Sequence, residues 1–194
     1  MDRWRGRSAR IVGAMADQKF PPLQYDFLPE VPSFTLVSDD IAEGQPMPAA
    51  QASGMFGVPG GSDTSPHLRW EGAPEGTKSF AVTCFDPDAP TGSGFWHWGV
   101  FNIPASVTEL PAGAGSQDGS GLPSGAIQIR NDANVPGYVG AGPPPGRNHR
   151  YVFAVHALDV EETGVDANAS NAFAGFLMFG HVLGRAVLTA TFAR

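Results

Sequence analysis

The stretch CFDPDAPTGSGFWHWGVFNIP, residues 84–104, is the most informative part of this sequence for its fold. It places two acidic residues and two prolines within five positions, and it ends in a strand-like run with His97 between two tryptophans. Each proline fixes its own φ angle and biases the residue before it towards an extended conformation or a cis bond. The turn is therefore predicted to be stiff enough to aim the carboxylates of Asp86 and Asp88.

A surface turn that is simply rich in Asp and Pro is the alternative, since both are common turn residues. The histidine favours a site, because an imidazole between two tryptophans lies in a partly dry environment and needs partners for its nitrogens. Asp86 and Asp88 are the predicted partners. Strict alternation along the strand would place on one face Phe95, His97, Gly99 and Phe101, and on the other Trp96, Trp98 and Val100.

Composition indicates a mainly β protein of one domain. The length of 194 residues suits a single core. The 25 glycines and 18 prolines are distributed along the chain and separate short apolar runs. Strand-like runs are predicted at residues 33–38, 67–72, 79–85, 95–103, 126–131 and 150–160. Several are apolar on both faces, as expected of central strands.

The chain is predicted to end in a helix followed by a short strand. Five apolar residues follow one another at roughly helical spacing, with Ser170 or Asn171 as the N-cap: Phe173, Phe176, Leu177, Leu183 and Val187. The strand is expected at 188–192. Residues 1–22 are expected to form a flexible tail, with Met15 as an alternative start, and residues 23–194 to form the domain.

Charge and cysteine content exclude several classes of protein. The net charge of -7 argues against a general binder of nucleic acid or anionic membranes, while an isolated anion pocket stays open. Cys84 is the single cysteine, which excludes an intramolecular disulfide and a Cys-rich zinc site. An inert buried thiol and the lack of a long apolar run favour a cytoplasmic protein without a transmembrane segment.

A second cluster lies in YVGAGPPPGRNHRYVFAVHAL, residues 138–158. Three consecutive prolines between Gly142 and Gly146 predict a stiff wall. His149 follows at the mouth of a strand on which Tyr151, Phe153 and Val155 share one face, while Arg150, Val152, Ala154 and His156 share the other. His149 is therefore placed to face a cavity surrounded by backbone N–H groups.

Taken in order, DPDAP, WHW with NIP, GPPPG and HRY resemble the phosphatidylethanolamine-binding protein (PEBP) family, in particular its bacterial Raf kinase inhibitor-like branch. The resemblance covers about residues 23–194. It implies a sandwich-like fold of antiparallel β-sheets with few helices, and one small pocket for phosphate, sulfate, carboxylate or a phospholipid head group. The implied ligand-binding residues are Asp86, Asp88, His97, Gly142, His149 and Tyr151, with Pro90, Pro143 and Pro144 as walls.

These residues favour a non-catalytic, cofactor-free protein that binds a small anion. A carboxylate beside an imidazole favours the protonated ring, and such a histidine pair would hold an oxyanion without lysines. Two alternatives stay open. One is an inhibitor of a kinase or protease acting through the pocket rim and loops at 56–61 and 112–121; the other is an Asp/His-dependent hydrolase or metal-binding protein. The resemblance also implies a homodimer.

Overall fold

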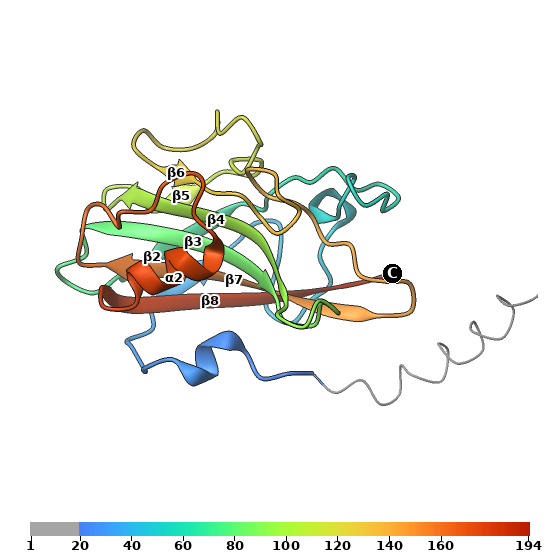
Figure 1. The fold of residues 1–194 in the computed structure, drawn as a ribbon, viewed down its shortest axis with the longest axis horizontal. Helices are drawn as coiled ribbons and strands as arrows, with labels where there is room; N and C mark the ends of the chain where they lie inside the picture. The colour runs from blue at the N-terminus through green and yellow to red at the C-terminus, as the bar shows by residue number, and fades with distance from the viewer. Residues whose placement is uncertain (1–19) are drawn as a thin grey trace, which may run out of the picture.

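The computed structural model describes residues 20–194, which form three layers (Figure 1). A three-stranded sheet has the order β1 (Thr35–Val37), β2 (Leu68–Glu71), β5 (Glu109–Leu110). A five-stranded sheet has the order β6 (Ile127–Gln128), β4 (Phe95–Pro104), β3 (Ser79–Asp86), β7 (Asn148–Leu158), β8 (Val182–Ala193). Helix α2 (Asn171–Met178) covers the face of the larger sheet that points away from the smaller sheet. The predicted mainly β, sandwich-like fold is confirmed.

Short turns and several long loops join the elements of the described chain. They are η1 (Gln24–Phe27), β1 (Thr35–Val37), η2 (Ala49–Gln51), β2 (Leu68–Glu71), β3 (Ser79–Asp86), β4 (Phe95–Pro104), β5 (Glu109–Leu110), β6 (Ile127–Gln128), β7 (Asn148–Leu158), α2 (Asn171–Met178) and β8 (Val182–Ala193).

Strand β3 lies at the centre of the larger sheet and pairs antiparallel with β4 and β7. All eight of its residues are buried, which explains why its sequence is apolar on both faces. One face packs in the core between the two sheets, with Trp70, Val82 and Phe153. The other face packs under α2, with Ala81, Phe101 and Met178.

A β-bulge in β4 overturns the predicted alternation around His97. Cys84 pairs with Trp98 and Phe85 pairs with Trp96, so His97 is the extra residue. Trp98 lies in the core between the sheets, whereas Trp96 lies on the α2 side. The prediction that the two tryptophans share a face is therefore wrong, because strict alternation does not continue through a bulge.

Phe95 and His97 are likewise separated from the residues predicted to share their face. They lie together on the cavity described below, while Gly99 contacts Asn171 of α2 and Phe101 packs under that helix. The bulge thus moves the imidazole to the inter-sheet side of the larger sheet. The sequence does not reveal this, because a bulge is set by the pairing with a distant strand.

The C-terminal segment has a shorter helix and a longer strand than predicted. Ser170 caps α2 as expected, accepting a hydrogen bond from the Phe173 N–H at 3.1 Å. The helix ends at Met178, and β8 then runs for 12 residues paired with β7. The assignment of Leu183 and Val187 to the helix is wrong, because ladder pairing with β7 outweighs the local helical spacing.

The outer edge of β8 is covered by two irregular segments. The Arg185 N–H donates to the Pro32 carbonyl at 2.9 Å, and the Met47 N–H donates to the Thr191 carbonyl at 2.8 Å. The Thr191 N–H donates in turn to the Gln45 carbonyl at 2.9 Å. The backbone groups on this edge therefore find partners within the same chain.

The predicted tail of residues 1–22 falls mostly outside the described residues, which begin at residue 20. The Phe20 ring lies 4.8 Å from the guanidinium carbon of Arg150, and the Pro21 carbonyl accepts a hydrogen bond from Arg150 Nη2 at 2.6 Å. These residues thus contact β7. None of the helices that the structure describes has the length and apolar character of a membrane-spanning segment.

The loop after β6 runs beside β4 and fixes the bulged residue. The Val139 N–H donates to the His97 carbonyl at 3.0 Å. At the next position, a Cβ atom on Gly140 would lie 2.3 Å from the carbonyl carbon of Ala52. Only glycine allows this approach of two backbones, which also holds Gly142 at the cavity wall.

We expect Gly140→Ala to lower the free energy of unfolding by about 2 to 3 kcal/mol, because the added methyl group overlaps backbone that cannot rotate away. Chemical denaturation of the purified variant measures this. Gly175→Ala is the matched control: no heavy atom lies within 4 Å of its added Cβ, and alanine favours the helix by up to about 1 kcal/mol. Equal stability of the two variants would contradict the close approach.

Candidate functional site

A cavity of about 260 Å³ lies where β3 ends and β7 begins. We call it the Asp86 cavity. Seven of the nine residues predicted for the site line it: Asp86, Pro90, His97, Gly142, Pro144, His149 and Tyr151. Phe56, Ala89, Thr91 and Phe95 complete the lining. Two predicted residues, Asp88 and Pro143, are not part of this lining.

Asp86 lies at the centre of the site and is 3% exposed. Its Oδ1 accepts a hydrogen bond from the Asp88 N–H at 2.8 Å, which closes the turn at Pro87. Its Oδ2 accepts a hydrogen bond from His149 Nδ1 at 2.8 Å and lies 4.0 Å from His97 Nε2. One carboxylate thus joins the rigid turn to both predicted histidines.

Asp88 has a different place from the predicted one. Its carboxylate accepts hydrogen bonds from Arg150 Nε at 3.0 Å and Nη2 at 2.9 Å, and from the Arg150 backbone N–H at 2.8 Å. A bidentate pair of this kind fixes geometry as well as charge. Asp88 therefore anchors the turn to β7 and leaves Asp86 as the carboxylate beside the histidines.

His149 is held in a defined orientation by Asp86. The imidazole is 3% exposed, and donation from Nδ1 to the carboxylate leaves Nε2 available to a ligand. In the neutral ring Nε2 accepts a hydrogen bond, and in the protonated ring it donates one. The buried carboxylate compensates the positive charge of the protonated form.

His97 differs from His149 although both lie near Asp86. Its Nδ1 donates to the Val139 carbonyl at 2.7 Å, so the lone pair of the neutral ring is on Nε2. Burial lowers the pKa of His97, and the Val139 carbonyl and the Asp86 carboxylate only partly oppose this. The expectation that the carboxylates keep both imidazoles protonated is therefore wrong for His97, because desolvation outweighs the attraction.

Tyr151 contributes a hydroxyl group at the base of the cavity. Its Oη is buried and makes no hydrogen bond of normal geometry with the described residues, although the Gly142 backbone interacts with it. Burial raises the pKa of Tyr151 above its ordinary value, and the negative charge of Asp86 adds to the rise. The hydroxyl therefore stays protonated and can donate to a bound ligand.

Aromatic rings form much of the rim. The Phe95 ring lies 4.8 Å from the His97 ring and 6.2 Å from the Phe56 ring, measured between centroids. A Cβ atom on Gly142 would lie 2.8 Å from the Phe56 ring, so the glycine makes room for it. Phe56 lies in the loop that the sequence suggested as a protein-binding rim, but no local pattern indicated its place beside His97.

The remaining histidines lie elsewhere. His67 pairs with Glu109 at 3.1 Å beside β2, and His181 pairs with Asp159 at 2.8 Å on the surface. His156 lies under α2, on the opposite face of the larger sheet. In the sequence, only the neighbouring motifs distinguish His97 and His149 from these three histidines.

The cavity offers little for metal or thiol chemistry. Within residues 20–194, no group of three or more His, Cys, Asp or Glu side chains is arranged to hold a metal ion. Cys84 is fully buried, and burial raises its pKa well above the ordinary value, so the thiol is not activated. The polar side chains in the described lining that can form hydrogen bonds with a ligand include Asp86, His97, His149 and Tyr151.

Comparison with known proteins agrees with this geometry. The model of the family described as phosphatidylethanolamine-binding protein matches residues 17–193. The UPF0098 protein YbhB of Escherichia coli is 49% identical over 158 residues, which cover 81% of this chain and 99% of YbhB. The crystal structure of E. coli YbcL is 47% identical, with a TM-score of 0.81 over 84% of this chain and 99% of that one.

A more distant solved structure has the same fold. The PEBP homologue CT736 of Chlamydia trachomatis is 27% identical, with a TM-score of 0.70 over 84% of this chain and 98% of that one. The motifs, the sheet order and these matches agree. The chain belongs to the phosphatidylethanolamine-binding protein family.

Proposed function

We propose that the protein binds a small phosphate-bearing anion in the Asp86 cavity without transforming it. The observation that carries this proposal is the His149–Asp86 pair in the same cavity as the Tyr151 hydroxyl, whose hydrogen has no acceptor among the described residues. With Nδ1 held by Asp86, a protonated His149 donates from Nε2 to an oxyanion, and such charge-assisted hydrogen bonds are strong. Tyr151 supplies a second donor.

The neutral state of His97 narrows the choice of anion. Its Nε2 and the Asp86 Oδ2 are both acceptors and lie 4.0 Å apart. A ligand that carries both charged oxygens and a hydroxyl hydrogen satisfies acceptors and donors together. A singly protonated phosphate monoester has this combination, whereas a sulfate ester lacks the hydrogen.

The ligand class includes phosphorylated small molecules and phospholipid head groups, since both present a phosphate group. The cavity volume of about 260 Å³ suits the phosphate and a few attached atoms. Pro90, Pro144 and Phe56 form exposed walls, whereas Asp86, His149 and Tyr151 are buried and largely out of contact with water. A drier site strengthens charged contacts.

We expect His149→Gln to weaken the binding of methyl phosphate at pH 6 about tenfold or more, because a charge-assisted hydrogen bond becomes a neutral one. Isothermal titration calorimetry measures the affinity. His181→Gln is the matched control, since His181 lies on the surface with Asp159. Unchanged affinity in His149→Gln would refute the assignment.

Methyl phosphate and methyl sulfate test the acceptor role of His97, because at about pH 5 both exist mainly as monoanions but only the phosphate carries a hydroxyl hydrogen. We expect methyl phosphate to bind about tenfold more tightly. Phosphate monoesters lose their second proton near pH 6, so the ratio of affinities should fall as the pH is raised to 8. A ratio of one at about pH 5 would contradict donation to His97.

The Asp86–His149 pair also favours one alternative, an Asp/His-dependent hydrolase, because such a pair is the usual arrangement of a general base. Thr91 lines the cavity, but its hydroxyl donates to the Gly94 carbonyl, so it is not poised as a nucleophile. Release of methanol from methyl phosphate, abolished by His149→Gln, would replace the binding proposal with this one.

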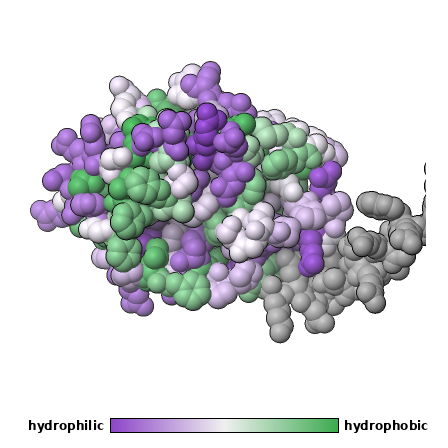
Figure 2. Space-filling view, in the orientation of Figure 1, coloured by the Kyte–Doolittle hydropathy of each residue, from purple (hydrophilic) through white to green (hydrophobic). Residues whose placement is uncertain are grey.

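A homodimer is a separate proposal. Phe173, Phe176 and Phe179 of the α2 region are each more than half exposed, and Figure 2 shows apolar side chains gathered over this part of the surface. Sedimentation equilibrium tests it, with Phe176→Ser expected to yield monomers if this surface is the interface.

Regulation of a kinase or protease through the cavity rim is also a proposal, and a binding partner that loses affinity for a Phe56→Ser variant would support it.

A further inference from the structure

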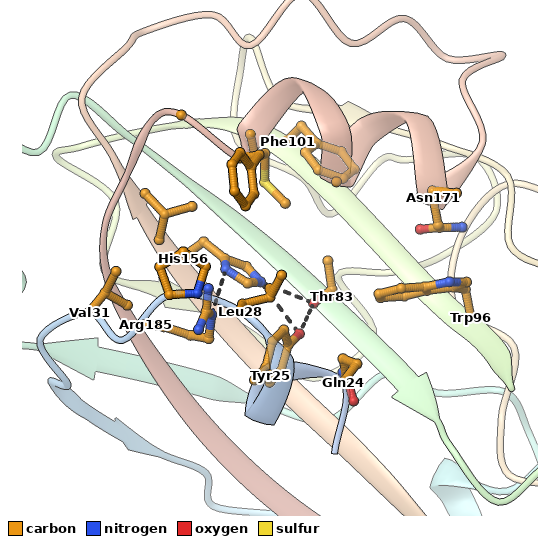
Figure 3. A pocket seen from close by; sticks show the side chains of 17 residues that line it. Gln24, Tyr25, Leu28, Val31, Thr83, Trp96, Phe101, His156, Asn171 and Arg185 are labelled. Atoms are coloured by element: carbon orange, nitrogen blue, oxygen red, sulfur yellow. Dashed lines mark hydrogen bonds between the residues drawn. The ribbon is translucent and has the colours of Figure 1, made fainter. Parts of the chain in front are cut away.

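A second cavity, of about 340 Å³, lies on the opposite face of the larger sheet, under α2 (Figure 3). We call it the α2 cavity. The segment from η1 to Val31 closes one side, α2 closes another, and β3, β4, β7 and β8 form the floor. Most of its lining is apolar, including Leu28, Val31, Trp96, Phe101, Met178 and Val182. Its volume lies in the range of small-molecule sites.

The floor carries a compact polar group made by distant parts of the chain. Tyr25 Oη lies 3.1 Å from Thr83 Oγ1, and His156 Nε2 lies 3.4 Å from Thr83 Oγ1 and 3.5 Å from Tyr25 Oη. Arg185 Nε donates to His156 Nδ1 at 3.4 Å. His156 is therefore the neutral tautomer with its hydrogen on Nε2.

Counting hydrogens shows that this group has a donor to spare. Three hydrogens are available, from His156 Nε2, Thr83 Oγ1 and Tyr25 Oη. One hydroxyl hydrogen lies between Tyr25 Oη and Thr83 Oγ1, and the hydrogen on His156 Nε2 points to one of these two oxygens. The second hydroxyl hydrogen finds no acceptor within the trio, because Nε2 is already protonated. Outside the trio, the side-chain amide of Gln24 lies against the Tyr25 hydroxyl, so a ligand acceptor would compete with Gln24 for this hydrogen.

Arg185 supplies a positive charge without a carboxylate partner. Its guanidinium lies 4.6 Å over the Tyr25 ring, and no Asp or Glu of the described residues lies within ion-pair distance of it. The Arg185 side chain is partly buried, and this burial lowers its pKa. Burial and the Arg185 charge lower the pKa of His156 to about 3, so the histidine adds no charge.

We propose that the α2 cavity is a second ligand site, which takes a small monocarboxylate with an apolar body, such as a medium-chain fatty acid. The carboxylate pairs with Arg185 and accepts the spare hydroxyl hydrogen of the Tyr25–Thr83 pair. The apolar body lies between α2 and the side chains of Trp96 and Phe101. One cation and one spare hydrogen match one carboxylate, whereas a phosphate dianion would leave a charge unpaired in apolar surroundings.

Two unsatisfied amide groups are consistent with an occupied cavity. The Asn171 Oδ1 is buried and lacks a hydrogen-bond donor among the described residues, although its Nδ2 donates to the Arg130 carbonyl at 3.1 Å. The amide of Gln24 is buried, and its interaction with the Tyr25 hydroxyl falls short of normal hydrogen-bond geometry. Both side chains line the cavity, as Figure 3 shows.

This site is independent of the Asp86 cavity. The two lie on opposite faces of the larger sheet and share no lining residue. Their ligands also differ, since one site offers a histidine paired with a carboxylate and the other an arginine without one. A failure of either proposal therefore leaves the other standing.

The test is calorimetric titration of the full chain with octanoate, and with octanol as a neutral ligand of the same length. We expect octanoate to bind at one site per chain, and octanol about tenfold or more weakly. Arg185→Gln should weaken octanoate to a similar extent. Absence of octanoate binding, or equal affinity for octanol, would overturn the proposal.

Two further variants separate loss of the site from loss of the fold. A Cβ on Gly175 meets no heavy atom within 4 Å, so Gly175→Leu should fold and obstruct the cavity, abolishing octanoate binding. His149→Gln should bind octanoate as the parent does. Octanoate binding that survives both Arg185→Gln and Gly175→Leu, or that is lost in His149→Gln, would place the fatty acid elsewhere and refute the α2 site.

Discussion

The pairing of β3 with β7 determines where chemistry can occur in this protein. Side chains alternate between the two faces of a sheet, so a strand buried on both sides can serve two cavities at once. Asp86 and His149 lie on the inter-sheet side, whereas Thr83 and His156 lie on the α2 side. The two histidines of β7 are seven residues apart, and this odd spacing places them on opposite faces.

Local environment then gives the two histidines of the Asp86 cavity different properties. His149 has a carboxylate at hydrogen-bond distance, whereas His97 has a backbone carbonyl and only a distant contact with the same carboxylate. Desolvation therefore dominates at His97 and keeps its ring neutral. Two residues of the same type thus differ, since His97 offers an acceptor at Nε2 and His149 has its Nε2 available to a ligand. This difference underlies the proposed preference for one oxyanion over another.

Much of the fold and the site was predictable, because local motifs carry strong physical constraints. The strand at residues 79–85 and the stiff turn after it follow from apolar runs and proline positions. The order of the motifs predicted that His97 and His149 lie in one pocket. The bulge at His97 and the length of β8 depend on pairing with distant strands. The Asp88–Arg150 contact also depends on the pairing of distant strands, and no local sequence pattern indicates such pairing.

The α2 cavity was outside the reach of sequence reasoning for the same reason. Its polar floor joins Tyr25, Thr83, His156 and Arg185, which span most of the described chain. Each of these residues alone is ordinary in its own segment. Only the fold shows that an arginine, a neutral histidine and two hydroxyl groups meet under an apolar wall.

The covered edge of β8 has a consequence for association between molecules. An open strand edge is a template on which another chain can add a strand, and long uncovered edges promote aggregation. Here Pro32, Gln45 and Met47 already occupy backbone groups along that edge. Growth of the larger sheet by strand addition is therefore blocked on this side, and any self-association that involves it must rely on side-chain packing.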